Sequence, residues 1–229
     1  GAEHRIWRVA EPDRVSAIRL AMRPKKLVIA DGHHRYETAL AFRQERPDLE
    51  DARWAMMTFV NMDAPGLRVL ATHRLLDAPA PADFADRLRA RFRVREAGSV
   101  DVLRRAWAEP HPALYRIGVA FPSGEVLLVE ADRPQGGLDV AFLHEKILGE
   151  MLGIGEEDVR QERGIRYVRG ADVAREAVRS GDAKLAFLLE PVSVADVARV
   201  SFSGGVMPQK STDFYPKLLS GLTVYPIEK

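Results

Sequence analysis

The 229-residue chain contains no cysteine. This absence excludes disulfide bonds, thiolate nucleophiles and cysteine-ligated metals, and it is compatible with a reducing cytoplasm. The sequence also lacks a signal peptide and any run of about 18 apolar residues, so it predicts a soluble cytoplasmic protein. The chain also has almost no excess of positive or negative charge, because 34 basic residues are balanced by 33 acidic ones, for a net charge of +1. Neither a nucleic acid nor a membrane is therefore expected as a partner.

The composition is that of a folded protein. Hydrophobic residues make up 46% of the chain and charged residues 29%, which is ordinary for a globular domain. Helix-like and strand-like apolar patterns alternate along the chain, without internal repeats, and this alternation predicts a mixed α/β (α+β) fold. The expected strands cover Leu27 to Ala30, Trp54 to Met62, Ile165 to Val168 and Lys184 to Glu190, with a hairpin from Ala113 to Ala131. The expected helices cover His33 to Arg46, Pro81 to Phe92, Leu138 to Leu152, Ala171 to Ser180 and a segment capped by Ser193.

The most distinctive stretch is Asp31 to Tyr36, "DGHHRY", where the first expected strand gives way to a helix. Gly32 lets the backbone approach a ligand closely, and the first helical turn offers unpaired N–H groups that suit phosphate. Arg35 adds a fork of donors, while His33 and His34 can donate hydrogen bonds or carry a proton. An accidental surface pair of histidines and a plain Asp-Gly turn are the alternatives. A zinc site is disfavoured, since no cysteine or suitably spaced carboxylate accompanies the histidines.

Two further groups are candidates for an anion site. Lys210, Ser211 and Thr212 lie in the Gly- and Pro-rich C-terminal stretch, which predicts a long and functional loop. Its glycines stand at the wrong spacing for a P-loop, so the alternative is a tail pinned to the core by apolar side chains. His73 and Arg74 follow the second expected strand and can join the same site, or form an ordinary surface turn.

Two long motifs, "ADGHHRYETA" and "MPQKSTDFYPKLLSGL", resemble the bacterial and archaeal family called domain of unknown function 1015. Members of that family are longer at the N-terminus. The resemblance therefore implies that the chain is the C-terminal part of such a protein, or a trimmed form in which Gly1 is a vector remnant.

The "DGHHR" stretch also resembles the phosphate-binding box of the ParB and sulfiredoxin superfamily. Sulfiredoxins carry a cysteine directly after the glycine, where this chain has His33, so their chemistry is excluded. The free-serine kinases of the superfamily have a similar box and transfer a phosphoryl group from a nucleotide to a small hydroxyl compound. On this resemblance we expect residues 1–80 to hold the phosphate-binding element, 81–200 a second α/β half, and 201–229 a loop that packs back on the site.

This resemblance implies a kinase that uses ATP or ADP with Mg²⁺ and acts on a small hydroxyl-bearing metabolite such as an amino acid. Asp31 would orient the metal or the attacking hydroxyl, with His33 and His34 as further catalytic groups. The residues expected to contact the nucleotide are Gly32, Arg35, Tyr36, His73, Arg74, Lys210, Ser211 and Thr212. The alternatives are a non-catalytic, ParB-like nucleotide-binding regulator and a binder of another anionic metabolite; a homodimer is compatible with any of them.

Overall fold

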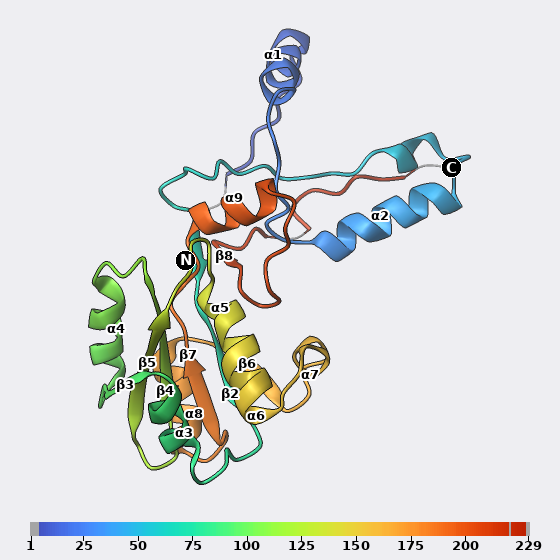
Figure 1. The fold of residues 1–229 in the computed structure, drawn as a ribbon. Helices are drawn as coiled ribbons and strands as arrows, with labels where there is room; N and C mark the ends of the chain where they lie inside the picture. Colours follow the sequence, from blue (N-terminus) through green and yellow to red (C-terminus); the bar gives the residue numbers. More distant parts are fainter. Residues whose placement is uncertain (1–4, 220, 228–229) are drawn as a thin grey trace.

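A six-stranded sheet lies in the lower part of Figure 1, which draws the computed structural model; the structure describes residues 5–219 and 221–227. Its strand order is β3-β5-β4-β7-β2-β6, and each neighbouring pair is antiparallel. The strands of this sheet are β2 (Thr72–Leu76), β3 (Arg93–Glu96), β4 (Leu114–Ala120), β5 (Val126–Asp132), β6 (Ile165–Arg169) and β7 (Leu185–Leu188). The mixed α/β fold class is therefore confirmed, with an antiparallel rather than a parallel sheet.

Helices cover both faces of this sheet. Because side chains alternate along a strand, Leu127 and Val129 of β5 pack into one apolar cluster, and Val126 and Leu128 into the other. The first cluster holds side chains from α3 (Phe84–Arg91) and from the continuous helical segment α5 (Asp139–Phe142), η2 (Leu143–Gly149) and α6 (Glu150–Leu152). The second holds side chains from α4 (Val100–Ala108) and α8 (Ala171–Arg179).

The elements predicted after residue 80 are confirmed. The hairpin forms from β4 and β5 around a turn in which Gly124 has a φ of 90°. The helix expected from Leu138 ends at Gly153, whose φ of 70° places it in the left-handed region that favours glycine. Ser193 caps α9 (Val194–Phe202), its hydroxyl accepting a hydrogen bond from the Asp196 N–H at 3.0 Å.

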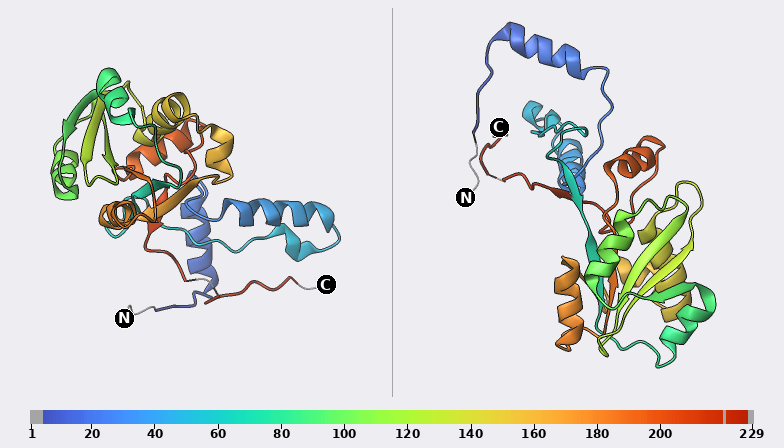
Figure 2. Two further views of the ribbon diagram at one scale, coloured as in Figure 1. Left: turned by 90° about the horizontal axis from the view of Figure 1, so that it is seen from below. Right: turned by 90° about the vertical axis from the view of Figure 1, so that its left-hand side faces the viewer.

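Residues 5–60 project away from the sheet (Figures 1 and 2). Neither α1 (Pro12–Met22) nor α2 (His33–Glu45) contains a buried residue. A small second sheet joins this part to the rest, because β1 (Arg68–Leu70) pairs with β8 (Asp213–Tyr215), from the C-terminal loop. A third apolar cluster around Val69, Val197 and Phe214 holds α9 against it. The elements not yet placed are η1 (Glu50–Arg53) and α7 (Glu156–Arg160).

Two predicted strands are wrong. Leu27 to Ala30 and Trp54 to Met62 form neither strand nor helix, and large side chains in them are exposed, such as Trp54 at 65%. A β-strand exists only where its backbone N–H and C=O groups pair with a neighbour, and no strand of the described chain pairs with either run. Helix α2 forms where the sequence predicts it, but it buries no face, since Tyr36 and Leu40 are 38% and 40% exposed.

None of the helices in the described part of the chain is long and apolar enough to cross a bilayer. The division of the chain near residue 80 stays a prediction. Strands from both sides of that position, β2 before it and β3 to β7 after it, share one sheet. Gly1 lies outside the described residues.

Candidate functional site

Gly32 opens helix α2 in a left-handed conformation, with a φ of 86° and a ψ of 31°. Its carbonyl accepts the first helical hydrogen bond, from the Tyr36 N–H at 3.1 Å. The N–H groups of His33, His34 and Arg35 find no acceptor among the described residues. Three donors at the positive end of a 13-residue helix therefore lie open to a ligand.

The guanidinium of Arg35 lies over Gly32. A Cβ atom at position 32 would stand 2.7 Å from Arg35 Nη2 and would displace the guanidinium, and the φ of 86° also favours glycine here. The Arg35 side chain is 73% exposed, and its Nη2 atom lies 3.9 Å from the Asp31 carboxylate. A separation of this length is a loose ion pair in water, and Arg35 remains available to a stronger anionic partner.

Lys217 is a cation at this corner that sequence reasoning did not include in the site. Its ammonium lies 3.5 Å from the Asp31 carboxylate and 3.3 Å from that of Asp213. Asp213 also accepts a hydrogen bond of 2.8 Å from Arg169 Nη2. Burial would raise the pKa of Asp213, but the hydrogen bonds from Arg169 and Lys217 outweigh it and lower the pKa. Asp213 therefore stays ionised and pairs with both cations, of which Lys217 also contacts Asp31.

His33 and His34 are exposed beside the open N–H groups. Their ring centroids are 3.9 Å apart. The Nδ1 atom of His34 lies 3.6 Å from the Glu37 carboxylate, one turn along the helix. Both imidazoles can reach solvent and a ligand bound at this corner, and neither is locked in the core.

The loop with Lys210, Ser211 and Thr212 runs between this corner and the sheet. Lys210 has a φ of 54°, a conformation uncommon outside glycine. Its ammonium lies 2.8 Å from the Glu162 carboxylate and 5.5 Å from the ring centroid of Tyr167. Ser211 is buried, and its hydroxyl donates to the Pro208 carbonyl at 2.5 Å; Thr212 is half-buried.

His73 and Arg74 are buried on β2, at 3% and 1% exposure, so the surface-turn alternative is wrong. As neighbours on a strand they face opposite sides of the sheet. His73 Nδ1 accepts a hydrogen bond from the Leu189 N–H at 3.1 Å. The Nη2 atom of Arg74 donates to the carbonyls of Gln209 and Lys210 at 3.4 and 3.3 Å. The structure thus joins Arg74 to the C-terminal loop, whereas His73 faces away.

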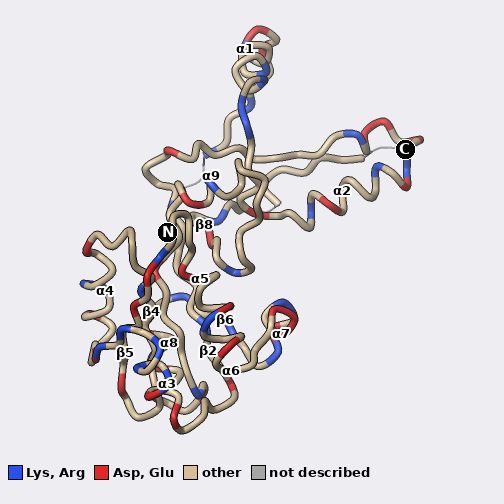
Figure 3. The backbone as a smooth tube through the Cα atoms, in the orientation of Figure 1, with Lys and Arg blue, Asp and Glu red and all other residues tan. Residues whose placement is uncertain are grey.

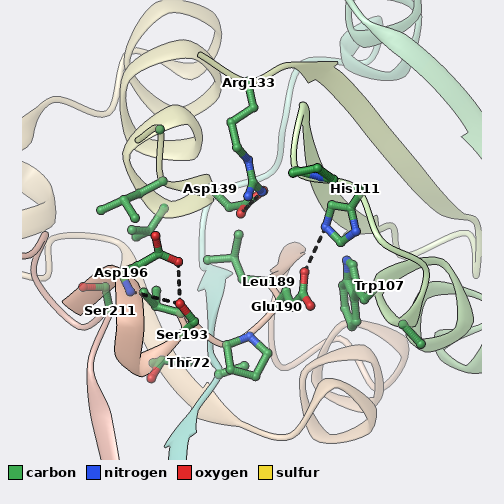
Figure 4. A pocket seen from close by; sticks show the side chains of 18 of the residues that line it. Thr72, Trp107, His111, Arg133, Asp139, Leu189, Glu190, Ser193, Asp196 and Ser211 are labelled. Carbon is green, nitrogen blue, oxygen red and sulfur yellow. Dashed lines mark hydrogen bonds and ion pairs between the residues drawn. The ribbon is translucent and has the colours of Figure 1, made fainter. Parts of the chain in front are cut away.

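A cavity of about 350 Å³ opens where β2, β7 and this loop meet (Figure 4). Arg74 and Ser211 line it, so the structure brings two of the predicted residues to one pocket. Most of its polar lining was not foreseen from the sequence. The other charged or polar side chains around the cavity are Thr72, Glu109, His111, Arg133, Asp139, Glu190, Ser193 and Asp196.

His111 and Glu190 form a paired acid and base in this pocket. His111 Nδ1 lies 2.6 Å from the Glu109 carbonyl, which can only accept a hydrogen bond, so Nδ1 carries a proton. Its Nε2 atom lies 3.0 Å from the Glu190 carboxylate. Burial raises the pKa of Glu190, while His111 opposes the shift.

The buried His73 predicts an acid-sensitive stability. Burial lowers its pKa from 6.5 to about 4, with Arg74 and Arg104 adding to the shift. Between these values the unfolded chain binds the proton and the folded chain does not, so stability falls as the pH falls. We expect a loss of about 2 kcal/mol between pH 7 and pH 5. In His73→Asn the amide oxygen of asparagine can still accept the Leu189 N–H, but the titrating group is gone. Urea unfolding at a series of pH values should therefore show a smaller loss of stability between pH 7 and pH 5 than in the parent chain. The same loss in both proteins would contradict this role of His73.

Basic and acidic residues are interleaved on most elements of the described chain (Figure 3). A short basic run, "RPKK" at residues 23–26, follows α1. Interleaved charge of this kind does not form the basic stripe expected of a nucleic-acid groove.

The sequence profile of the family described as "Protein of unknown function (DUF1015)" matches residues 1–145. The chain belongs to this family. The similarity covers the Gly32 corner, β1 to β5 and most of the pocket wall, while the C-terminal loop lies beyond the matched range. The comparison with curated proteins finds no match.

Solved structures resemble the DUF1015 chain at low sequence identity. A free serine kinase in complex with AMP is 16% identical, with 90% of this chain and 81% of the other covered and a TM-score of 0.49. A variant of that kinase in complex with ADP has 15% identity, the same two coverages and a TM-score of 0.49. A conserved hypothetical protein from Pyrococcus furiosus has 16% identity, coverages of 88% and 81%, and a TM-score of 0.48. At this level of similarity the likeness assigns no activity to the chain.

Proposed function

We propose that this protein is a nucleotide-dependent phosphotransferase that acts on a small hydroxyl-bearing molecule, such as an amino acid, in the cytoplasm. The observation that carries the proposal is the open helix N-terminus at Gly32, where three free N–H groups lie beside the cations of Arg35 and Lys217. Phosphoryl transfer needs little from a protein besides positioning and stabilisation of the charge that develops on the phosphate. The N–H groups at this corner can position the phosphate oxygens, and the cations can stabilise the charge on them.

The roles follow from these positions. The N–H groups of residues 33–35 would cradle the nucleotide phosphates, and Arg35 and Lys217 would neutralise their charge. In the transfer step, the acceptor oxygen bonds to the terminal phosphorus, the bond to the departing phosphate breaks, and the hydroxyl proton passes to a base. Asp31, His33 and His34 are the candidate bases, because all three are exposed at the corner.

The described residues fit Mg²⁺ only as a companion of the nucleotide. They contain no group of three side chains that could hold a metal ion. Mg²⁺ is commonly bound by one or two carboxylates together with substrate phosphates, and Asp31 is a suitable carboxylate. Lys217 now lies against that carboxylate and would have to move aside. When bound, the ion would neutralise phosphate charge.

The structure places some of the other predicted nucleotide-contact residues where a ligand could reach them, and others not. Arg74 and Ser211 lie at the pocket, and Tyr36 lies one turn into α2. Lys210 already has a carboxylate partner in Glu162, and His73 faces the opposite side of the sheet from Arg74. We therefore keep Gly32, Arg35 and the backbone of residues 33–35 as the primary nucleotide contacts, and add Lys217.

Phosphoryl transfer to a small hydroxyl compound tests this function directly. With ATP or ADP, Mg²⁺ and a panel of hydroxyl compounds, we expect a phosphorylated product detectable by mass spectrometry. Asp31→Asn should lower the rate about 100-fold or more, the usual effect of removing a general base. Glu45→Gln, which changes an exposed carboxylate at the opposite end of α2 from Gly32, is the matched control. Nucleotide binding without any product would instead favour the non-catalytic regulator.

A further inference from the structure

Arg74 is a buried cation without an anionic partner. Its side chain is 1% exposed, and no carboxylate of the described residues forms an ion pair with it. Its Nη atoms donate to the carbonyls of Thr72, Gln209 and Lys210, but its Nε atom has no hydrogen-bond partner in the described structure. Burial lowers the pKa of Arg74 to about 10, so the guanidinium stays charged at neutral pH. An isolated buried charge is costly unless a counter-ion compensates it.

Two other buried polar groups near Arg74 also lack a hydrogen-bond partner among the described residues. Tyr167 lies beneath the guanidinium, with its ring centroid 5.4 Å from Arg74 Cζ, and its buried hydroxyl has no partner among the described residues. His144 Nε2 is likewise buried and unpaired, and the Arg74 charge adds to the burial that lowers the pKa of His144 to about 4. Three unsatisfied polar atoms in one region are unusual in a folded protein. Arg74 is among the residues that line the cavity, so a group bound there would lie next to this residue.

The charges on the rest of the cavity wall restrict what that bound group can be. Asp139 accepts hydrogen bonds from the Arg116 N–H at 2.9 Å and from the Arg133 guanidinium, so its oxygens are occupied. Asp196 and Glu190 are two further carboxylates of the wall: Asp196 accepts from the Ser193 hydroxyl at 2.7 Å and from Arg199 at 3.1 Å, and Glu190 contacts His111.

Glu109 adds another carboxylate to the lining. A phosphate dianion would therefore lie close to several negative charges. A ligand with one negative and one positive group matches this wall better, because each charge then meets its opposite.

We propose that this cavity is a binding site for a small α-amino acid or a similar amino-carboxylate. The carboxylate would pair with Arg74, as a bidentate partner of the guanidinium, and the ammonium would face Asp196 and Glu190. The hydroxyls of Thr72, Ser193 and Ser211 line the same space for a polar ligand side chain. A volume of about 350 Å³ suits a ligand of this size. The assignment of this ligand as the phosphoryl acceptor rests on the proposed function, but its binding does not.

Ligand variants test the charge match without altering the protein. Thermal-shift and calorimetric titrations without nucleotide would use a panel of α-amino acids, the amide and the N-acetyl derivative of each that binds, and inorganic phosphate. We expect at least one amino acid to bind, and its amide and N-acetyl derivative to bind more than 10-fold more weakly, since each lacks one charge. Absence of binding by every amino acid would overturn the proposal. Equal binding of the N-acetyl derivative or of phosphate would also overturn it.

Protein variants locate the site. Arg74→Met should weaken binding more than 30-fold, and Asp196→Asn, at a half-exposed position, should weaken it about 10-fold. Arg179→Gln, on the exposed side of α8, is the matched control and should bind normally. Normal affinity in both Arg74→Met and Asp196→Asn would place the ligand elsewhere. If Arg74→Met does not fold, Asp196→Asn still decides. These titrations contain no nucleotide, so their failure and a failure of nucleotide binding at Gly32 are separate results.

Discussion

Replacing Gly32 with alanine is expected to weaken nucleotide binding at least about 100-fold. The new Cβ atom would stand 2.7 Å from Arg35 Nη2, and alanine rarely adopts the φ of 86° found at this position. Both effects move the guanidinium and the first-turn N–H groups away from the phosphates. The loss of two charge-assisted hydrogen bonds, each worth about 1.5–3 kcal/mol, accounts for this size. Calorimetric titration with ATP and ADP would measure it.

Gly66→Ala is the matched control for this variant. A methyl group added at Gly66 would meet no atom within 4 Å, and Gly66 has no positive φ, so its substitution should leave affinity unchanged. Arg35→Ala should reproduce much of the loss, because it removes the guanidinium and leaves Gly32 in place. If Gly32→Ala and Arg35→Ala both bound nucleotide as tightly as the parent chain, the Gly32 corner would not be the phosphate site.

Replacing Gly118 with valine is expected to lower the free energy of unfolding by about 3 kcal/mol or more. Gly118 lies in the middle of β4, where a Cβ atom would stand 2.5 Å from Leu103 Cδ1 and 3.0 Å from Leu188 Cβ. Leu103 and Leu188 are completely buried, with exposures of 0%. Overpacking a rigid interior typically costs about 1–3 kcal/mol, and valine adds two methyl groups beyond the clashing atom. Urea unfolding would measure the change in midpoint.

A second substitution can confirm the cause. Leu103→Ala alone should destabilise the protein by leaving a cavity. In the double variant with Gly118→Val, the valine can occupy part of that cavity, so the total loss should be smaller than the sum of the two. Gly66→Val is the control for adding a valine at a glycine. A loss below about 1 kcal/mol for Gly118→Val would contradict the packing of α4 against β4.

The predictions that succeeded rest on local signals. Phe84 and Leu88 recur at helical spacing and are buried at 1% and 0% exposure in α3. Gly124 in a turn and Ser193 at a helix start fix element ends through their own backbone or side-chain chemistry. A signal contained within a few residues can be recognised without knowing the rest of the fold.

The predictions that failed depended on distant partners. Trp54 to Met62 has the composition of a buried strand, but composition does not supply a neighbouring strand. The same limit applies to the site. Gly32 and Arg35 were predicted because they lie in one short motif, three residues apart, whereas Lys217 reaches Asp31 only through the pairing of β8 with β1. The pocket combines Arg74, His111 and Glu190, which are far apart along the chain.

Amide resonances of a ¹⁵N-labelled sample, recorded during a titration with Mg²⁺ and ADP or ATP, test the central claim most directly. If the start of α2 holds the phosphates, the N–H signals of His33, His34 and Arg35 should shift most, because these donors gain an anionic acceptor. Saturating shifts at these three amides are the result we predict. Unchanged signals there, whether the nucleotide binds elsewhere or not at all, would contradict the phosphate site at Gly32.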